Sequence, residues 1–191
     1  MKLHAKNRDG SAQGRHSLDD RRRRTTVPEL NLIAGVARTG AIGDGETIPW
    51  HYDEDETQYK HRVADHPVVV GRTTHEGMTR VRGTHPVVLT STPEAYDEPD
   101  ATFVSSVPDA VAAVAAHGDT GWVIGGQSIY ATFLPYAHRA FVSELPETTT
   151  ASRVFPYLGS NWTVERTHEY DQFDVVEYEN KAPADPGETS N

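Results

Sequence analysis

The stretch PVVVGRTTHEGM, residues 67–78, decides the fold class. Its β-branched run, Pro67–Gly71, predicts a buried strand, and the residues after it predict a short helix that opens with a capping box at Thr73–Glu76. The same arrangement returns at VIGGQSIY, residues 123–130, where an apolar run meets a helix predicted at Gln127–Phe133. Repeated strand–glycine–helix units indicate an α/β fold with a parallel sheet.

Further elements extend this pattern in both directions. A helix is predicted at Asp53–Ala64 and another at Ser106–His117, where Ser106 is the N-cap and Gly118 ends the helix. Near the C-terminus, apolar and polar residues alternate around Asp171-Gln172, which predicts an antiparallel hairpin. Strands are expected at Leu30–Ala37, Val87–Thr90, Thr102–Val104, Gly121–Gly125, Ala140–Leu145, Trp162–Tyr170 and Phe173–Glu179. The predicted architecture is a single α/β domain with a mostly parallel central sheet, a C-terminal antiparallel hairpin and helices on both faces.

Charge and polarity divide the chain into three parts. Residues 1–26 are basic, almost without apolar side chains, and are expected to be disordered. Residues 27–179 form the predicted domain, and residues 180–191 are expected to be a loose polar tail. Residues 1–24 carry eight Lys/Arg against three Asp/Glu, a charge of +5. Since the net charge of the whole chain is −10, the remaining residues carry a charge of −15.

The acidic, lysine-poor domain predicts a protein adapted to concentrated salt, and an ordinary acidic protein is the alternative. Such a surface repels phosphates, so nucleic acid is not an expected partner. No cysteine is present, and no apolar run reaches the roughly 18 residues of a membrane span. Without a signal sequence, the protein is expected to be cytoplasmic. The histidines lack metal-ligand spacing, so no metal is expected.

Two glycine junctions are candidate phosphate sites. Gly71-Arg72-Thr73-Thr74 and Gly125-Gly126-Gln127-Ser128 each follow a strand and open a helix, where backbone N–H groups attract phosphate. Two such junctions suit a dinucleotide better than a mononucleotide. Neither matches the standard dinucleotide or P-loop motif, and each is equally compatible with a tight turn and a helix cap.

A third candidate is the glycine-punctuated loop at residues 42–50, which leads into Asp55 on the predicted helix. Tyr59 and Arg62 share a helix face with Asp55, so this carboxylate is a candidate for pairing with a cationic or amidine-like heterocycle. The alternative is that all four acids of the first turn, Asp53–Glu56, are solvated.

In order and spacing, these pieces resemble the dihydrofolate reductase family. The matching stretches are LIAGVA (32–37), AIGDGETIPW (41–50), DEDETQYK (53–60), PVVVGRTTHEGM (67–78), PVVLTS (86–91) and VIGGQSIY (123–130). The resemblance implies reduction of 7,8-dihydrofolate to tetrahydrofolate by NADPH, in a protein expected to be a monomer.

The resemblance also implies roles for individual residues. Asp55 matches the acid that binds the pterin, and Trp50 the residue that holds an ordered water beside it. The other substrate positions implied are Ile33, Tyr59, Met78 and Ser143. The cofactor positions implied are Gly35, Ala41, Ile42, Gly43, Asp44, Gly45, Glu46, Thr47, Arg72, Thr73, Thr74, Thr90, Ser91, Gly125, Gly126, Gln127, Ser128, Ile129 and Tyr130, with a Gly125–Gly126 bond that is commonly cis in the family.

Three departures from the family pattern concern ligand binding. Thr84 stands where the family has an arginine that clamps the folate glutamate, and Arg80 is a candidate replacement. Residues 151–156 lack the acid of the family's GDTxFP loop, and Ser128 replaces a phosphate-binding arginine. These departures keep two alternatives open: a riboflavin-pathway pyrimidine reductase or other pterin reductase on the same fold, and a degenerate, non-catalytic nucleotide-binding module.

Overall fold

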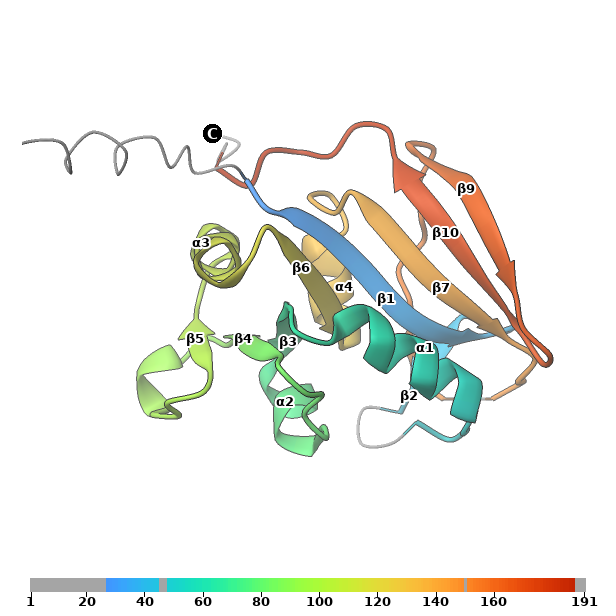
Figure 1. Ribbon diagram of the computed structural model, residues 1–191, viewed down its shortest axis with the longest axis horizontal. Coiled ribbons are helices and arrows are strands. Elements are labelled where there is room, and N and C mark those ends of the chain that lie inside the picture. Colours follow the sequence, from blue (N-terminus) through green and yellow to red (C-terminus); the bar gives the residue numbers. More distant parts are fainter. Residues whose placement is uncertain (1–26, 45–47, 150, 188–191) are drawn as a thin grey trace, which may run out of the picture.

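The structure, a computed structural model, describes residues 27–44, 48–149 and 151–187. An eight-stranded sheet dominates it, with the strand order β5-β4-β3-β6-β1-β7-β10-β9 (Figure 1). The strands are β1 (Glu29–Ala37), β3 (Pro67–Gly71), β4 (His85–Leu89), β5 (Thr102–Val104), β6 (Thr120–Gly125), β7 (Arg139–Leu145), β9 (Trp162–Glu169) and β10 (Asp174–Asn180). Strand β10 pairs antiparallel with both β7 and β9, whereas the other pairs are parallel. The mostly parallel sheet and the C-terminal hairpin are therefore confirmed.

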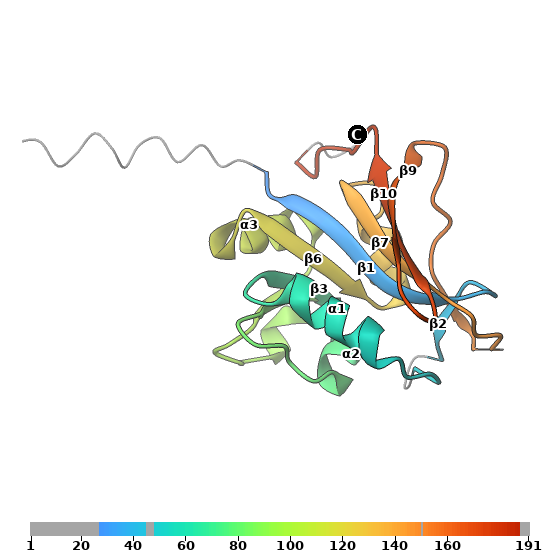
Figure 2. The same cartoon turned by 45° about the vertical axis from the view of Figure 1, so that its right-hand side comes forward.

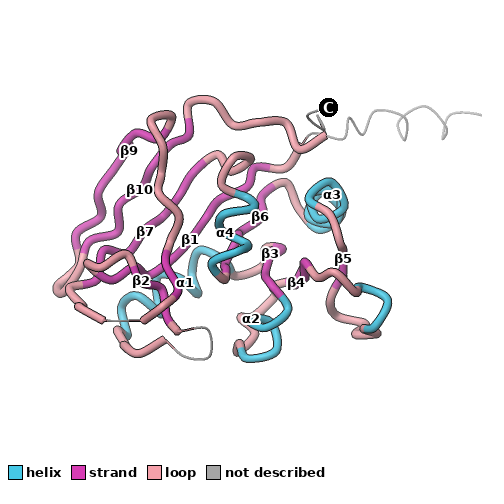
Figure 3. Tube along the Cα trace, turned by 180° about the vertical axis from the view of Figure 1, so that it is seen from behind, coloured by secondary structure: helices cyan, strands magenta, loops and turns pink. Residues whose placement is uncertain are grey.

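Helices cover both faces of the sheet, as predicted. Figure 1 shows α1 (Asp53–Val63) in front of the sheet, and the view from behind in Figure 3 shows α4 (Gln127–Phe133) on the opposite face. Two further helices, α2 (Arg72–Gly77) and α3 (Val107–His117), follow β3 and β5 in the chain, and Pro93–Ala95 forms a 3₁₀ turn. Figure 2 shows the β9–β10 hairpin at the edge of the sheet opposite α3.

Alternation along β1 divides the apolar side chains into two cores. Leu30, Leu32 and Ala34 pack with the buried residues of α3 and α4, whereas Ile33 packs with Val63 of α1. The core with α3 and α4 covers one face of β1 and the core with α1 covers the other, which explains its nearly continuous apolar sequence. The carboxyl end of β1 is thus held in the centre of the molecule, under α1.

A small second sheet supports the loop after β1. Strand β2 (Ala41–Gly43) pairs antiparallel with β8 (Arg153–Val154), and the Phe155 amide donates to the Gly40 carbonyl at 3.0 Å. The family-like loop at residues 42–50 therefore begins on a β-bridge. Residues 45–47 of this loop lie outside the described residues.

Two local predictions were wrong, and a third was confirmed. Helix α2 begins at Arg72, so its N-cap is Gly71, which has no side chain to cap the helix, and Thr73 lies inside the helix. Glu76 pairs with Arg72 at 2.7 Å. The predicted loose tail also begins too early, since Asn180 is the buried last residue of β10 and donates to the Ala137 carbonyl at 2.9 Å. Ser106 does cap α3, accepting from the Asp109 amide at 3.2 Å.

The N-terminal segment 1–26, predicted to be disordered, lies outside the described residues. Across the part of the chain that the structure describes, no helix is both long and apolar enough to cross a bilayer.

Candidate active site

Asp55 differs from the other acids in the first turn of α1. Asp53, Glu54 and Glu56 are exposed, whereas Asp55 is partly buried against the sheet. Its Oδ1 accepts hydrogen bonds from Ser143 Oγ of β7 at 2.5 Å and from Gln58 Nε2 at 2.9 Å. Two protein donors therefore hold this oxygen in place. The structure thus favours the interpretation of Asp55 as a site residue over that of a solvated first-turn acid.

Gly35 of β1 lies directly against this carboxylate. A Cβ atom at Gly35 would lie 3.1 Å from Asp55 Oδ2 and 3.7 Å from the indole nitrogen of Trp50. The predicted pair Asp55 and Trp50 is therefore brought together at the carboxyl end of β1, where a small residue is needed for the close approach. Ile33, another predicted substrate residue, is buried in the same strand. Tyr59 lies on α1, and burial raises the pKa of its hydroxyl to about 12.

The two glycine junctions also come together. A Cβ atom at Gly71 would lie 2.9 Å from Ile129 of α4, and one at Gly126 would lie 3.3 Å from the Thr74 hydroxyl of α2. The Gly125–Gly126 peptide is cis, and neither α2 nor α4 has a side-chain cap. The ends of the neighbouring parallel strands β3 and β6 thus lie side by side at the carboxyl edge of the sheet, where α/β sheets bind ligands.

The sequence of this chain matches that of a known protein family. The family model described as dihydrofolate reductase matches residues 29–182. The chain belongs to the dihydrofolate reductase family.

Similar dihydrofolate reductases come from halophilic archaea. "Dihydrofolate reductase 1" of Haloarcula marismortui is 36% identical over 178 residues, covering 83% of this chain and 96% of the relative. "Dihydrofolate reductase HdrB" of Haloferax volcanii is 36% identical over 165 residues, covering 80% and 84%. These relatives support the salt-adapted character that the acidic composition predicted.

A solved dihydrofolate reductase shares the fold. The enzyme from Enterococcus faecalis, complexed with NADP(H) and RAB-propyl, superposes with a TM-score of 0.72 at 24% identity. The match covers 79% of this chain and 95% of the other. The dihydrofolate reductase fold predicted from the sequence is therefore confirmed.

Arginines predicted at the ligand sites of this dihydrofolate reductase pair with acids. Arg80 donates to Glu98 at 2.9 Å, and Arg72 donates to Glu76 at 2.7 Å. Thr84, at the family's arginine position, donates its hydroxyl to the Val81 carbonyl at 2.8 Å. Arg80 would therefore have to leave Glu98 before it could bind a substrate carboxylate.

The altered segment 151–156 of this family member contacts α4. Gln127 Oε1, at the start of α4, accepts from the Val154 amide at 2.9 Å. Phe155 packs edge-on against Tyr130, with ring centroids 5.1 Å apart, and the Tyr130 hydroxyl donates to the Ile33 carbonyl at 2.7 Å. Burial raises the pKa of this hydroxyl above its ordinary value. A hydrogen bond to Gln127 and an aromatic contact with Tyr130 thus attach this segment to α4.

The other residues that the resemblance implies for the site differ in their burial and contacts. Ala41 and Gly43 are buried in β2, Ile42 packs on the core, and Met78 directly follows α2. Thr90 accepts from the Thr92 amide at 3.4 Å, while Thr73, Ser91, Asp44 and Ser128 are exposed. Gly45, Glu46 and Thr47 lie outside the described residues.

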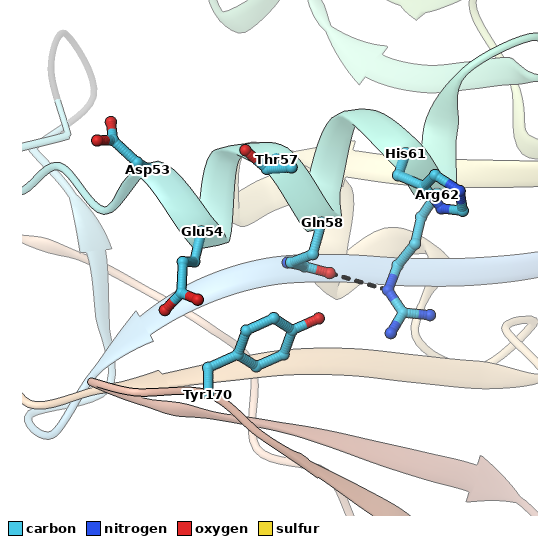
Figure 4. Close-up of a pocket in the computed structure, with 7 residues that line it drawn as sticks. All are labelled: Asp53, Glu54, Thr57, Gln58, His61, Arg62 and Tyr170. Atoms are coloured by element: carbon cyan, nitrogen blue, oxygen red, sulfur yellow. Dashed lines mark hydrogen bonds between the residues drawn. The ribbon is translucent and has the colours of Figure 1, made fainter.

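Gln58, which donates to Asp55 from the next turn of α1, was not predicted as a site residue. Gln58 is 8% exposed and forms part of the wall of an open groove of about 600 Å³ between α1 and Tyr170 (Figure 4). A signal was present in the sequence: Gln58 follows Asp55 by three positions, a spacing that brings helix side chains together. A lone glutamine in a polar helix gives no indication of burial, so this signal was not recognised.

Proposed function

We propose that this protein reduces 7,8-dihydrofolate to 5,6,7,8-tetrahydrofolate with NADPH, and that Asp55 binds and polarises the pterin. The observation that carries the proposal is the partly buried Asp55 carboxylate, held by Ser143 and Gln58 against Gly35. A carboxylate can accept hydrogen bonds from an amidine-like N–H pair such as that of the pterin ring. Trp50, Ile33, Tyr59 and Met78 supply the apolar and aromatic surroundings, and Arg80 is the proposed contact for the glutamate tail.

The glycine junctions fit a dinucleotide. Gly71 and Gly126 have no side chains that would separate their backbone from a ligand, and the hydroxyl of Thr74 lies against Gly126. We assign NADPH to these junctions, to Gly35 and the 41–47 loop, to Thr90 and Ser91, and to the segment Gly125–Tyr130. NADPH, when bound, supplies the hydride.

The residues of the chain then control where the proton goes. Reduction adds hydride to the carbon of the pterin C=N bond and a proton to its nitrogen, and protonation of that nitrogen makes hydride addition easier. Asp55 stabilises the protonated or polarised pterin electrostatically without touching the accepting nitrogen. Trp50 holds a water beside the ring, and closure of the site excludes other water.

Replacing Asp55 tests this mechanism. In Asp55→Asn the ring can still bind, but the negative charge that favours protonation is lost, so turnover at pH 7 should fall by about 10²-fold or more. Loss of the dihydronicotinamide absorbance with dihydrofolate, measured in high KCl, gives the rate, and a fluorescence titration gives NADPH affinity, which should stay nearly unchanged. Glu54→Gln, an exposed acid of the same turn, is the matched control. Equal turnover in wild type and Asp55→Asn would remove Asp55 from the mechanism.

The Arg80–Glu98 ion pair and Thr84 favour a second candidate, a riboflavin-pathway pyrimidine reductase or another pterin reductase. An enzyme that lacks the glutamate clamp has less reason to prefer folate. The same assay with a pyrimidine substrate, and with NADH in place of NADPH, separates these activities. Turnover with neither substrate would favour a non-catalytic nucleotide-binding module. We further propose a cytoplasmic monomer. We expect no nucleic-acid partner, because the acidic domain repels phosphates.

A further inference from the structure

Gln58 connects the Asp55 carboxylate to the outer surface of α1. Its side-chain nitrogen lies 2.9 Å from Asp55 Oδ1 and 3.3 Å from Ser143 Oγ, so both amide hydrogens face the carboxylate side. Its side-chain oxygen accepts from Arg62 Nε at 2.8 Å, on the groove side shown by the dashed line in Figure 4. The amide therefore has a donor end towards the site and an acceptor end towards solvent.

Arg62 determines which end of the amide faces inward. An amide group can rotate and present oxygen or nitrogen to the same neighbour. In the observed orientation Arg62 donates to Oε1 of Gln58. If the amide were rotated, its NH₂ group would face the Arg62 donor, and its Oε1 would face the acceptor Asp55 carboxylate. Arg62 is itself held in place, because its guanidinium lies 4.4 Å from the centroid of the Phe141 ring.

The Gln58–Asp55 hydrogen bond gives the two oxygens of the Asp55 carboxylate different surroundings. Oδ1 accepts from both Ser143 and Gln58, whereas Oδ2 faces Gly35, the residue whose added Cβ would lie 3.1 Å away. Two donors on Oδ1 restrict rotation of the carboxylate about its terminal bond. A fixed carboxylate plane is what a planar ring with two N–H donors requires.

We propose that Gln58, oriented by Arg62, is a positioning residue that fixes the Asp55 carboxylate for substrate binding and hydride transfer. The proposal rests on the proposed role of Asp55. Neither Gln58 nor Arg62 is expected to touch the substrate.

The first test is Gln58→Met, which keeps the length of the side chain and removes the donor. Loss of one hydrogen bond to a charged group should weaken dihydrofolate binding about tenfold. Tryptophan fluorescence measures this affinity without cofactor, and single-turnover absorbance measures hydride transfer, which should slow by a similar factor. NADPH affinity should not change. Thr57→Val, at the neighbouring groove position, is the matched control and should match the wild type in all three measurements.

The second test separates positioning from folding. With Asp55→Asn already present there is no carboxylate to orient, so adding Gln58→Met should have little further effect on binding or hydride transfer. Arg62→Met should give a smaller loss than Gln58→Met, because the amide then rotates freely instead of being absent. Equal losses from Gln58→Met in both backgrounds would show a merely structural role and overturn the proposal. Wild-type affinity and rate in Gln58→Met would also overturn it. Failure of the wild type to reduce dihydrofolate would refute the proposed function instead.

Discussion

At Gly71 the backbone of β3 lies within van der Waals distance of α4. A Cβ atom there would lie 2.9 Å from Ile129 Cγ1, closer than real Cβ atoms approach. Ile129 is buried in the core, so it has little room to move away. Gly77, at the other end of α2, has no atom within 4 Å of the same hypothetical Cβ. The two glycines therefore form a matched pair for substitution.

Gly71→Ala should lower the free energy of unfolding by about 1–3 kcal/mol, the usual cost of overpacking, and should weaken NADPH binding. Gly77→Ala should leave NADPH affinity unchanged, with stability equal to or slightly above the wild type. Urea denaturation and a cofactor titration measure the two quantities. Wild-type cofactor affinity in Gly71→Ala would argue against placing the cofactor at this junction.

Individual site residues differed in how far the sequence could predict them. Asp55, Trp50 and Ser143 were identified because a sequence resemblance carries them as a set. Gln58 could not be identified in this way, since its role depends on α1 turning that face towards β7 and on Arg62 reaching back by one turn. The same limit applies to Arg80, whose ion pair with Glu98 joins segments that sequence spacing does not relate.

Among the secondary-structure elements, α4 and the β2–β8 sheet are joined by one side chain. Gln127 begins α4, and its Oε1 accepts from the Val154 amide of β8, which pairs with β2 at the start of the loop over the site. A cofactor bound along α4 would therefore affect β8 through the hydrogen bond between Gln127 and the Val154 amide.

Gln127→Ala should speed hydrogen exchange of the Val154 amide by about fivefold, since a hydrogen bond worth about 1 kcal/mol is lost. It should also raise the KM for NADPH. Ser128→Ala, at the adjacent exposed position, is the control for exchange at Val154. An unchanged exchange rate in Gln127→Ala would mean that β8 is held by its pairing with β2 alone.

Element boundaries followed local chemistry where that chemistry is strong. The β-branched run of β3 and the Ser106 cap of α3 were predicted from sequence because each depends on neighbouring residues. The prediction of a capping box at α2 was wrong because the helix begins two residues before the expected first helical position, with Gly71 as its N-cap. The end of β10 was missed because the burial of Asn180 depends on Ala137, far away in the sequence.

At the scale of the whole molecule, excess negative charge makes individual cations important. Arg139 at the start of β7 lies 3.3 Å from Glu29, 3.3 Å from Glu165 and 3.6 Å from Glu177. It therefore joins β1, β9 and β10 at one end of the sheet. Without Arg139 these three acids would face one another.

Arg139→Gln should lower Tm more in about 0.1 M KCl than in concentrated KCl, because the Debye length of about 10 Å in dilute salt leaves repulsion unscreened. Arg38→Gln, an exposed arginine after β1, changes the net charge equally and is the control. Equal salt dependence in the two variants would contradict a special role for this cluster. Thermal melts monitored by circular dichroism are sufficient.

A histidine pair links stability to pH. His85 stacks on His117 with ring centroids 3.5 Å apart and contacts Thr102 at 2.8 Å. Burial, then His117 and Arg80, lower the pKa of His85 below its ordinary 6.5, while Asp100 opposes the shift. The unfolded chain therefore takes up this proton first as pH falls.

Stability from His85 should be fully present above about pH 6.5 and should be lost as pH falls from there through the lower pKa of the folded state. His85→Gln should show a shallower loss of stability between pH 7 and pH 5, measured by urea midpoints in constant KCl. The difference between the two proteins isolates His85 from the other histidines. Parallel pH profiles would contradict this assignment.

The position of β1 has a consequence for synthesis of the chain. Among the strands that the structure describes, β1 leaves the ribosome first, and it pairs with β6 and β7 in registers that join Glu29 to Thr120 and Asn31 to Arg139. Until those partners emerge, the apolar run LNLIAGVA has no neighbour in the nascent polypeptide and is exposed to aggregation or to chaperones. Since such distant pairings close slowly, refolding should wait on this central strand and not on the helices.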